Sequence, residues 1–354
     1  MGCARGQCPR LRELRRAGLP TLIDAGPGDR GDQAMTKPWC HAVNARFAIA
    51  SVALLVLSGC AGRAAKPAPA RVVRSAETEK RFPDPKVAVD ALVAACRADD
   101  EAALLAIFGD EARSLVKTGD AGADRERCKR FVDAAEQMTR LDPKGPDTLQ
   151  LVVGFDDWPF PIPLVKDARG WRFDTVEGEQ EMLRRRVGAD ELEAIAVCRS
   201  YVRAQEVYAS RPRDGGVQAY AQRIVSNPGR RDGLYWPAAG KGDESPLGPA
   251  VAAAGDYAKG KRPAGSWWGY YFRILTAQGP AAPGGAQSYL RDGRMTGGFA
   301  LVAYPVAYGS TGIMTFLVGR DGRVYERDLG EKTNEIVEEM RKYDPDGSWK
   351  LVSE

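Results

Sequence analysis

The chain has 354 residues, with 51 basic and 47 acidic side chains and a formal net charge of +4. Residues 1–59 hold eight of the basic and four of the acidic side chains, so the rest of the chain has 43 of each and no positive surplus to displace the counterions of a nucleic acid. The one histidine, His41, also precedes residue 60, which excludes Ser-His and Cys-His nucleophile pairs and His-ligated metal sites from the remainder. We expect no nucleic-acid partner, no cofactor and no metal.

The N-terminal part of the chain has the residue pattern of an export signal. Arg46 precedes an eleven-residue apolar run, residues 47–57, which is too short for a stable transmembrane helix. The run leads into a lipobox made of Leu57, Ser58, Gly59 and Cys60. This order predicts cleavage before Cys60 and its acylation, which would anchor the chain in a membrane. An uncleaved membrane anchor or a buried strand is the alternative interpretation.

The flanks of the apolar run predict where the chain begins and where it goes. Lys37 and Arg46 supply a positive flank, which makes Met35 the expected start. Ala61 follows the cysteine, and the absence of an aspartate there favours an outer-membrane destination facing the periplasm. We expect a mis-assigned upstream extension over residues 1–34, a signal peptide over 35–59 and a flexible tether over 60–80. An N-terminal domain over 81–188 and a C-terminal domain over 189–354 are expected to follow.

In the N-terminal domain the apolar pattern changes from helical to strand period. Apolar residues at helical spacing predict three helices, around residues 89–96, 104–108 and 128–135. Alternating apolar residues then predict strands at 149–155, 160–164 and 171–175, with the second at a sheet edge because Pro161 and Pro163 cannot donate hydrogen bonds. Helices followed by an antiparallel sheet indicate an α+β domain, similar in pattern to the nuclear-transport-factor-like folds.

The C-terminal domain is predicted to open with a separate helix. Asp190 and Glu193 form a candidate capping box, and the apolar stripe expected on this helix is Leu192, Ile195, Cys198 and Val202. A Pro- and Gly-rich segment, 226–266, follows. The remaining elements are strands at 270–276, 298–304, 313–318, 323–327 and 349–352, a hairpin turn at 319–322 and a helix at 332–342.

Several long phrases resemble a known family. DDWPFPIPLV (156–165), GWRFDT (170–175), YVRAQEVYAS (201–210), RDGLYWP (231–237), GYYFRILTAQGP (269–280) and GGFALVAYPVAYGSTGIMTFLVGRDGRVYERDLG (297–330) stand in order. Together they resemble the bacterial exported family known as domain of unknown function 2950. The resemblance implies a place in the cell envelope and no particular activity.

The second half also resembles the soluble head of pseudopilins. Ala-Gln-x-x-Tyr at 204–208 ends a helix, and Tyr-Gly-x-Thr-Gly at 308–312 lies within the sheet. In pseudopilins a long apolar helix behind a prepilin cleavage site runs into the head, whereas here a whole domain precedes the helix. The resemblance therefore concerns the fold of the head, and fold does not carry function.

Beyond the predicted cleavage site the chain has four cysteines, and three of them remain once Cys60 is assigned to lipid. Cys96 and Cys128 lie on the apolar faces of the first and third predicted helices, either as two buried thiols or as a disulfide, which an exported location favours. Cys198 is expected in the core. There is no CxxC pair, so neither a thioredoxin-like motif nor a zinc knuckle is predicted.

Carboxylates and aromatic residues form a candidate recognition surface, whose members are Asp156, Asp157, Trp158, Tyr235, Trp236, Trp267 and Trp268. With Glu177 and Glu179, the aspartates could be the paired carboxylates of a glycoside hydrolase, or they could be turn and helix-start residues. The aromatic residues could form a binding surface or a plug over a sheet.

The sequence thus predicts a two-domain α+β lipoprotein without a catalytic site. It would act as a binding or structural module of the envelope, with a protein or glycan partner. The alternatives are a carboxylate-dependent hydrolase of envelope glycan and an accessory of a secretion or pilus-like machine.

Overall fold

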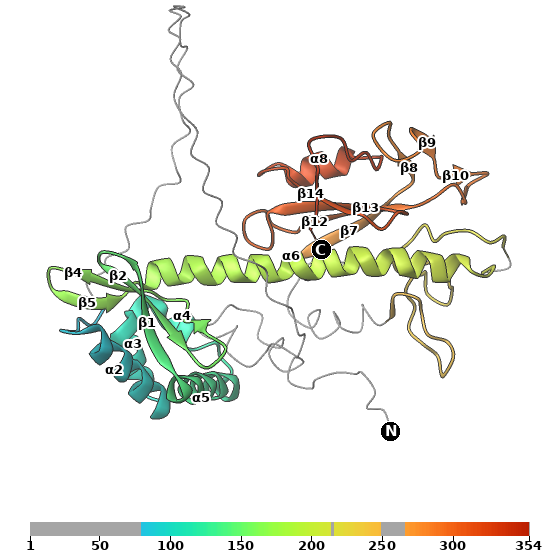
Figure 1. Cartoon of the computed structure of the whole chain (residues 1–354). Helices are drawn as coiled ribbons and strands as arrows, with labels where there is room; N and C mark the ends of the chain where they lie inside the picture. The colour runs from blue at the N-terminus through green and yellow to red at the C-terminus, as the bar shows by residue number, and fades with distance from the viewer. Residues whose placement is uncertain (1–78, 214–215, 249–265, 354) are drawn as a thin grey trace, which may run out of the picture.

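The computed structural model describes residues 79–213, 216–248 and 266–353. The fold is α+β: an N-terminal unit of helices and an antiparallel sheet, a long helix α6 (Thr175–Ala209), and a second antiparallel sheet (Figure 1). Cys60, the lipobox and the rest of the predicted export signal lie outside the described residues.

Short helices form one layer of the N-terminal unit: α2 (Pro85–Arg97), α3 (Glu101–Phe108), the 3-10 turn η1 (Asp110–Ala112), α4 (Arg113–Val116) and α5 (Ala121–Gln137). Asp84, Asp100 and Asp120 begin α2, α3 and α5, and each carboxylate accepts backbone N–H groups of the first turn. The apolar faces of these helices are buried in one core with the sheet. The three helices predicted from periodicity are confirmed.

The first sheet consists of β1 (Thr139–Gly145), β2 (Thr148–Val153), β3 (Trp158–Pro159), β4 (Leu164–Asp167) and β5 (Gly170–Phe173). Its strand order is β1-β2-β4-β5, with β3 paired to β2. The strand predicted at 160–164 is wrong. Phe160, Ile162 and Leu164 are buried alternately as expected, but Pro161 and Pro163 have no N–H to donate, so the chain crosses from β3 to β4 without forming a ladder.

The described residues begin two positions before the predicted start of the N-terminal domain at residue 81. Glu79 and Lys80, which the sequence assigned to the tether, contact the N-terminal unit. The Glu79 carboxylate pairs with Arg172 at 2.9 Å, and the amide of Lys80 donates to the carbonyl oxygen of Ala106. Burial is the largest influence on Glu79 and raises its pKa.

Helix α6 has 35 residues and runs without a break across the boundary expected at residues 188 and 189. The predicted capping box at Asp190 is wrong, because Asp190 is buried inside the helix. Leu192 was expected in the buried stripe but is 69% exposed. The helix contains no proline, and the glycine at this boundary, Gly188, costs only about 1 kcal/mol, so nothing local ends the helix there. Within the described residues, no helix has the length and apolar character needed to cross a membrane.

The second sheet contains β6 (Ser266–Trp267), β7 (Tyr270–Leu275), β12 (Ala300–Pro305), β13 (Met314–Gly319), β14 (Val324–Asp328) and β15 (Lys350–Leu351). These strands are antiparallel in the order β15-β14-β13-β12-β7-β6. The strands and the 319–322 turn predicted here are confirmed with small shifts at their ends. Two ribbons extend the sheet region, β8 (Ala277–Gln278) with β9 (Gln287–Ser288), and β10 (Leu290–Arg291) with β11 (Arg294–Met295).

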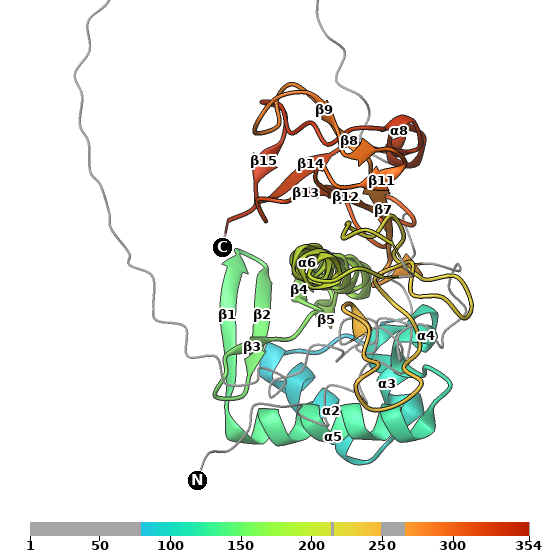
Figure 2. The same cartoon turned by 90° about the vertical axis from the view of Figure 1, so that its right-hand side faces the viewer.

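Helix α6 covers one face of the second sheet, and the short helix α8 (Thr333–Glu339) lies on the other side (Figures 1 and 2). Residues 300–303 of β12 are all buried, as expected for a strand covered on both faces. The Glu191 carboxylate accepts hydrogen bonds from the amides of Ile313 and Met314, which fixes α6 to the start of β13. Seen along its axis in Figure 2, α6 lies between the N-terminal unit and the second sheet.

Candidate functional site

The end of α6 and the segment after it are joined by a buried amide. Gln205 is fully buried; its Oε1 accepts the amide of Ala221 at 2.8 Å, and its Nε2 donates to the carbonyl oxygen of Ala221 at 2.8 Å. The Gln205 Nε2 also donates to the hydroxyl of Tyr201. Because both polar groups of Ala221 are satisfied by one side chain, the segment around residue 221 has a fixed position against the helix.

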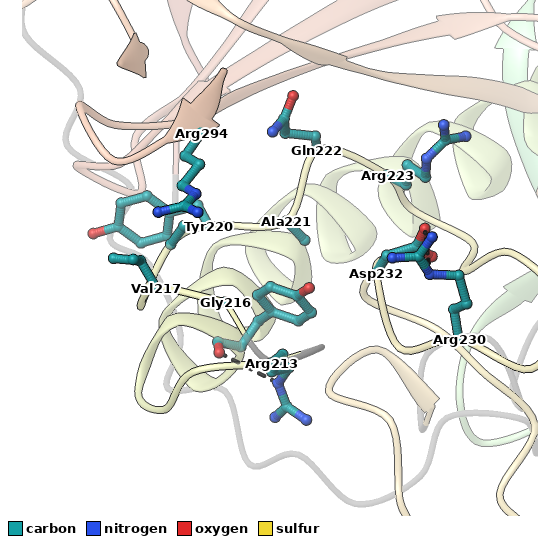
Figure 3. Close-up of a pocket in the computed structure, with 12 residues that line it drawn as sticks. Arg213, Gly216, Val217, Tyr220, Ala221, Gln222, Arg223, Arg230, Asp232 and Arg294 are labelled. Carbon is teal, nitrogen blue, oxygen red and sulfur yellow. Dashed lines mark hydrogen bonds and ion pairs between the residues drawn. The ribbon is translucent and has the colours of Figure 1, made fainter. Parts of the chain in front are cut away.

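A cavity of about 560 Å³ lies beside this segment (Figure 3). Its walls come from the last turn of α6, Arg213, the 216–223 segment, the turn at 230–232 and the β10–β11 ribbon. The lining residues are Tyr208, Arg213, Gly216, Val217, Ala219, Tyr220, Ala221, Gln222, Arg223, Arg230, Asp232 and Arg294. A space of this volume is in the range of small-molecule sites.

Tertiary hydrogen bonds bring Arg294 to the cavity. The amide of Tyr220 donates to the carbonyl oxygen of Met295 at 2.8 Å, and Gln222 Nε2 donates to the carbonyl oxygen of Gly293 at 2.9 Å. These contacts hold the β10–β11 ribbon against the 216–223 segment. In Figure 3, Arg294 lies near Tyr220 on one side of the cavity, and Arg230 lies on the opposite side.

The described residues of the lining are strongly positive in charge, with four arginines and one aspartate. The Asp232 carboxylate is already occupied: it accepts the amide of Asn227 at 2.9 Å and the Asn227 side chain at 2.6 Å, and it lies 3.8 Å from Arg230 Nε. Burial acts to raise the pKa of Asp232, but these hydrogen bonds and the Arg230 charge together lower it. Asp232 therefore stays ionised as part of its own turn.

Within the described part of the chain, the other three guanidinium groups of the lining have no carboxylate partner. In the described ranges 79–213, 216–248 and 266–353, no acidic side chain forms an ion pair with Arg213, Arg223 or Arg294. Arg223 and Arg294 are exposed at the rim, and Arg213 is half-buried. A guanidinium group without a carboxylate partner has N–H groups in its plane that can donate hydrogen bonds to an anion with several oxygens.

Arg213 is held between two aromatic rings. Its guanidinium carbon lies 5.0 Å from the ring centroid of Tyr208 and 5.1 Å from that of Trp236. Burial, followed by the charge of Arg211, lowers the pKa of Arg213, although an arginine stays protonated at neutral pH. Its Nε donates to the carbonyl oxygen of Tyr208 at 3.4 Å, so Arg213 also satisfies the C-terminal end of α6.

The predicted recognition surface is not one surface. Asp156 and Asp157 lie exposed in the turn between β2 and β3, and Asp157 pairs with Arg140 at 2.7 Å. Trp158 is buried and packs edge-on against Phe160. Glu177 lies in the first turn of α6, as its non-catalytic interpretation predicted, and pairs with Arg184 at 2.7 Å. None of these carboxylates lines the arginine cavity.

The other aromatic residues mostly fill the core. Trp236 and Trp268 are buried, while Tyr235 and Trp267 are half-buried. The indole N–H of Trp236 donates to the carbonyl oxygen of Asp243 at 3.0 Å, and one face of its ring meets Arg213. Trp267 packs against Phe272 of β7. Trp236 contacts the cavity through Arg213, which is one of its lining residues.

The cysteines lie where the helical pattern placed them. The sulfur atoms of Cys96 on α2 and Cys128 on α5 are 3.1 Å apart, and both are free thiols in this structure. Cys198 is fully buried, and burial raises its pKa to about 12. No group of three acidic or sulfur ligands suited to a metal occurs among the described residues.

Sequence reasoning missed the arginines of the cavity. A local signal existed, because five arginines stand between residues 211 and 231. Arg294 is more than sixty positions from Arg230 and joins them only through the β10–β11 ribbon. No pattern in the sequence connects those two positions.

Comparison with known proteins gives a family and no activity. No curated protein and no solved structure matches the chain. The model of one family matches residues 79–352, which is most of the chain and nearly all of its described part. The chain therefore belongs to the family described as protein of unknown function (DUF2950), in agreement with the resemblance of its sequence phrases.

Proposed function

We propose that this protein is a lipid-anchored, non-enzymatic binding protein of the cell envelope whose arginine-lined cavity takes a ligand bearing an oxyanion. The observation that carries the proposal is the set of three guanidinium groups, from Arg213, Arg223 and Arg294, that line one cavity without a carboxylate partner in the described part of the chain. A phosphate or a carboxylate would complete their hydrogen bonds.

The non-enzymatic part of the proposal rests on the chemistry of the side chains near the cavity. The one acid among its described lining residues, Asp232, is engaged with Asn227, and no histidine occurs after His41 to act as a base. Cys198 is buried with a raised pKa, which disfavours the reactive thiolate. Charged donors that surround a space without a nucleophile or a base favour binding over turnover.

The envelope location rests on the lipobox and on Cys60. Three acyl chains on Cys60 would exceed the two membrane signals that stable anchoring requires. Labelling cells with radioactive palmitate tests this part: wild type should carry label, and Cys60→Ser should not. Unlabelled wild-type protein recovered from the cytosol would contradict it.

Calorimetric titration of the purified protein tests the cavity. One arm uses inorganic phosphate and a second uses D-glucuronate, so that the two sources of an oxyanion are distinguished. We expect binding in at least one arm, with an affinity that falls as salt concentration rises. A double variant, Arg223→Glu with Arg294→Glu, should weaken that binding at least about tenfold, because each charge-assisted hydrogen bond contributes about 1.5–3 kcal/mol.

A matched control separates the cavity from general charge. Arg203 is exposed on α6, where it donates to Ser200, and it does not line the cavity. Arg203→Glu makes the same charge change as either cavity substitution and should leave the affinity unchanged. Absence of binding in both arms, or equal losses in the control and the cavity variants, would contradict the proposal.

A further inference from the structure

Two thiols face each other across the helical layer of the N-terminal unit. Cys96 lies in the last turn of α2 and Cys128 lies in α5, and the two helices pack side by side. Their sulfur atoms are 3.1 Å apart and share a hydrogen bond. A disulfide needs about 2.05 Å, so the sulfurs have to move together by only about 1 Å.

We propose that Cys96 and Cys128 are a site of oxidative modification, converted to an intramolecular disulfide that ties α2 to α5. A small cavity of about 20 Å³ lies against both residues and is otherwise lined mainly by apolar side chains, including Leu92 and Phe131. The two sulfurs therefore border a small open space in the apolar layer between the helices.

The two thiols differ in the way that stepwise oxidation requires. Cys128 is half-buried and reachable, whereas Cys96 is buried. The hydrogen bond with Cys96 lowers the pKa of Cys128, with Arg127 acting in the same direction and burial and Asp99 opposing it. The same hydrogen bond, followed by burial, raises the pKa of Cys96. Cys128 is therefore the attacking thiolate.

The oxidant is a small or protein disulfide, and the step is thiol–disulfide exchange. The Cys128 thiolate attacks one sulfur of the oxidant and forms a mixed disulfide, while the other half leaves as a thiolate. Cys96 then loses its proton to that leaving thiolate and attacks Cys128 Sγ, which releases the second half. Two protein thiols are oxidised to one disulfide, and the oxidant is reduced to two thiols.

The bond would close the chain between residues 96 and 128, a stretch that holds α3, η1 and α4. Cross-linking the ends of such a stretch restricts the unfolded chain, so the oxidised protein should be the more stable form. Cys198 cannot compete for either partner, because it is fully buried in the other hydrophobic core, beneath the second sheet.

The occurrence of this disulfide in cells rests on the proposed export, because disulfides persist in the envelope and not in the cytosol. Its formation from the folded chain does not rest on export. The experiment therefore has an in-vitro arm for the pairing and a cellular arm for the compartment.

In the first arm, reduced folded protein is treated with oxidised glutathione, alkylated and digested with trypsin. We expect the peptide 87–97 linked to a peptide carrying Cys128, a whole-protein mass lower by two hydrogen atoms, and a higher melting temperature. Cys96→Ser should instead hold one glutathione on Cys128, because the mixed disulfide has no resolving thiol. Cys198→Ser is the control and should oxidise like wild type.

Recovery of both thiols in the alkylated state, or of a lasting glutathione adduct on the wild-type protein, would overturn the proposal. In the second arm, cells are quenched with acid and alkylated before lysis. A linked pair in that arm supports the disulfide in the envelope. Reduced thiols there, together with ready pairing in vitro, would overturn the modification in cells while leaving the pairing geometry intact, and palmitate labelling of Cys60 in the same cells shows whether export itself has failed.

Discussion

Gly178 on α6 packs directly against Ile162, in the segment between β3 and β4, so closely that a Cβ at residue 178 would overlap Ile162 Cγ1. Ile162 is fully buried in the core of the N-terminal unit. The first turn of α6 is therefore fixed to that unit, while its later turns pack on the second sheet. One helix serves two cores, so its continuity couples them.

Gly178→Ala should destabilise the protein by about 1–3 kcal/mol, because the added methyl group overpacks a filled core. Denaturant unfolding of the purified protein measures this change. Gly188→Ala is the matched control, since a Cβ there would meet no atom within 4 Å. The control should stabilise the protein by about 0.5–1 kcal/mol through helix propensity. Equal effects of the two substitutions would contradict the contact with Ile162.

Gln205→Ala should destabilise the protein by about 2–4 kcal/mol, because it leaves the N–H and C=O of Ala221 buried without partners and opens a cavity. It should also weaken binding of the anion probe, since Ala221 belongs to the cavity wall that positions Arg223. Thermal unfolding and the titration described above measure the two effects. Arg203→Ala, at an exposed position of the same helix, should change stability by less than about 0.5 kcal/mol.

Asp120 should make the stability of α5 depend on pH. Hydrogen bonds from the amides of Ala123 and Gly122 lower the pKa of this carboxyl below its ordinary value of 3.8. Because the pKa is lowered in the folded state, the carboxylate of Asp120 makes its full contribution to the free energy of unfolding above about pH 4. This contribution is lost as the pH falls through the folded-state pKa. The stability difference between wild type and Asp120→Ala should therefore shrink in acid.

Asp120→Asn separates capping from charge in this experiment. Asparagine keeps the oxygen that caps the helix but has no carboxyl group to titrate. Unfolding curves are measured from pH 7 down to pH 3. The stability of Asp120→Asn should be near that of wild type at pH 7, and it should fall less than that of wild type in acid. A difference between wild type and Asp120→Ala that does not vary with pH would count against this role.

Thr315→Val should raise stability by about 1 kcal/mol. Thr315 is fully buried on β13, and its hydroxyl oxygen has no hydrogen-bond partner among the described residues. Valine has the same shape and removes a polar group whose burial is uncompensated. The midpoint of chemical denaturation measures the gain, and a lower midpoint would show that the Thr315 hydroxyl is satisfied in solution.

Patterns along the chain predicted most of the elements. The repeats around Val89 and Cys128 gave the correct helices, because burying one face requires apolar residues at helical spacing. The alternation of Phe160, Ile162 and Leu164 gave a false strand, because alternate burial does not require a hydrogen-bonded ladder. β1 was missed, since its residues are mostly exposed and include Pro143.

The cysteine pair was accessible to sequence reasoning, and the arginine cavity was not. Cys96 and Cys128 each occupy the buried face of a helix, so packing the two helices brings the sulfurs together. Arg223 and Arg294 are exposed residues with no periodicity to mark them. Their place in one cavity depends on the contact of Tyr220 with Met295.

Composition and local order were enough to establish the absence of histidine beyond residue 60, the family membership and the α+β class, because these depend on residue identity and on short-range spacing. The unbroken course of α6 and the convergence of the arginines depended on the packed molecule. Both follow from contacts between residues far apart in the chain, such as Glu191 with Ile313 and Gln205 with Ala221. Such contacts form when apolar faces are buried together, and their energy outweighs weak local preferences for a break.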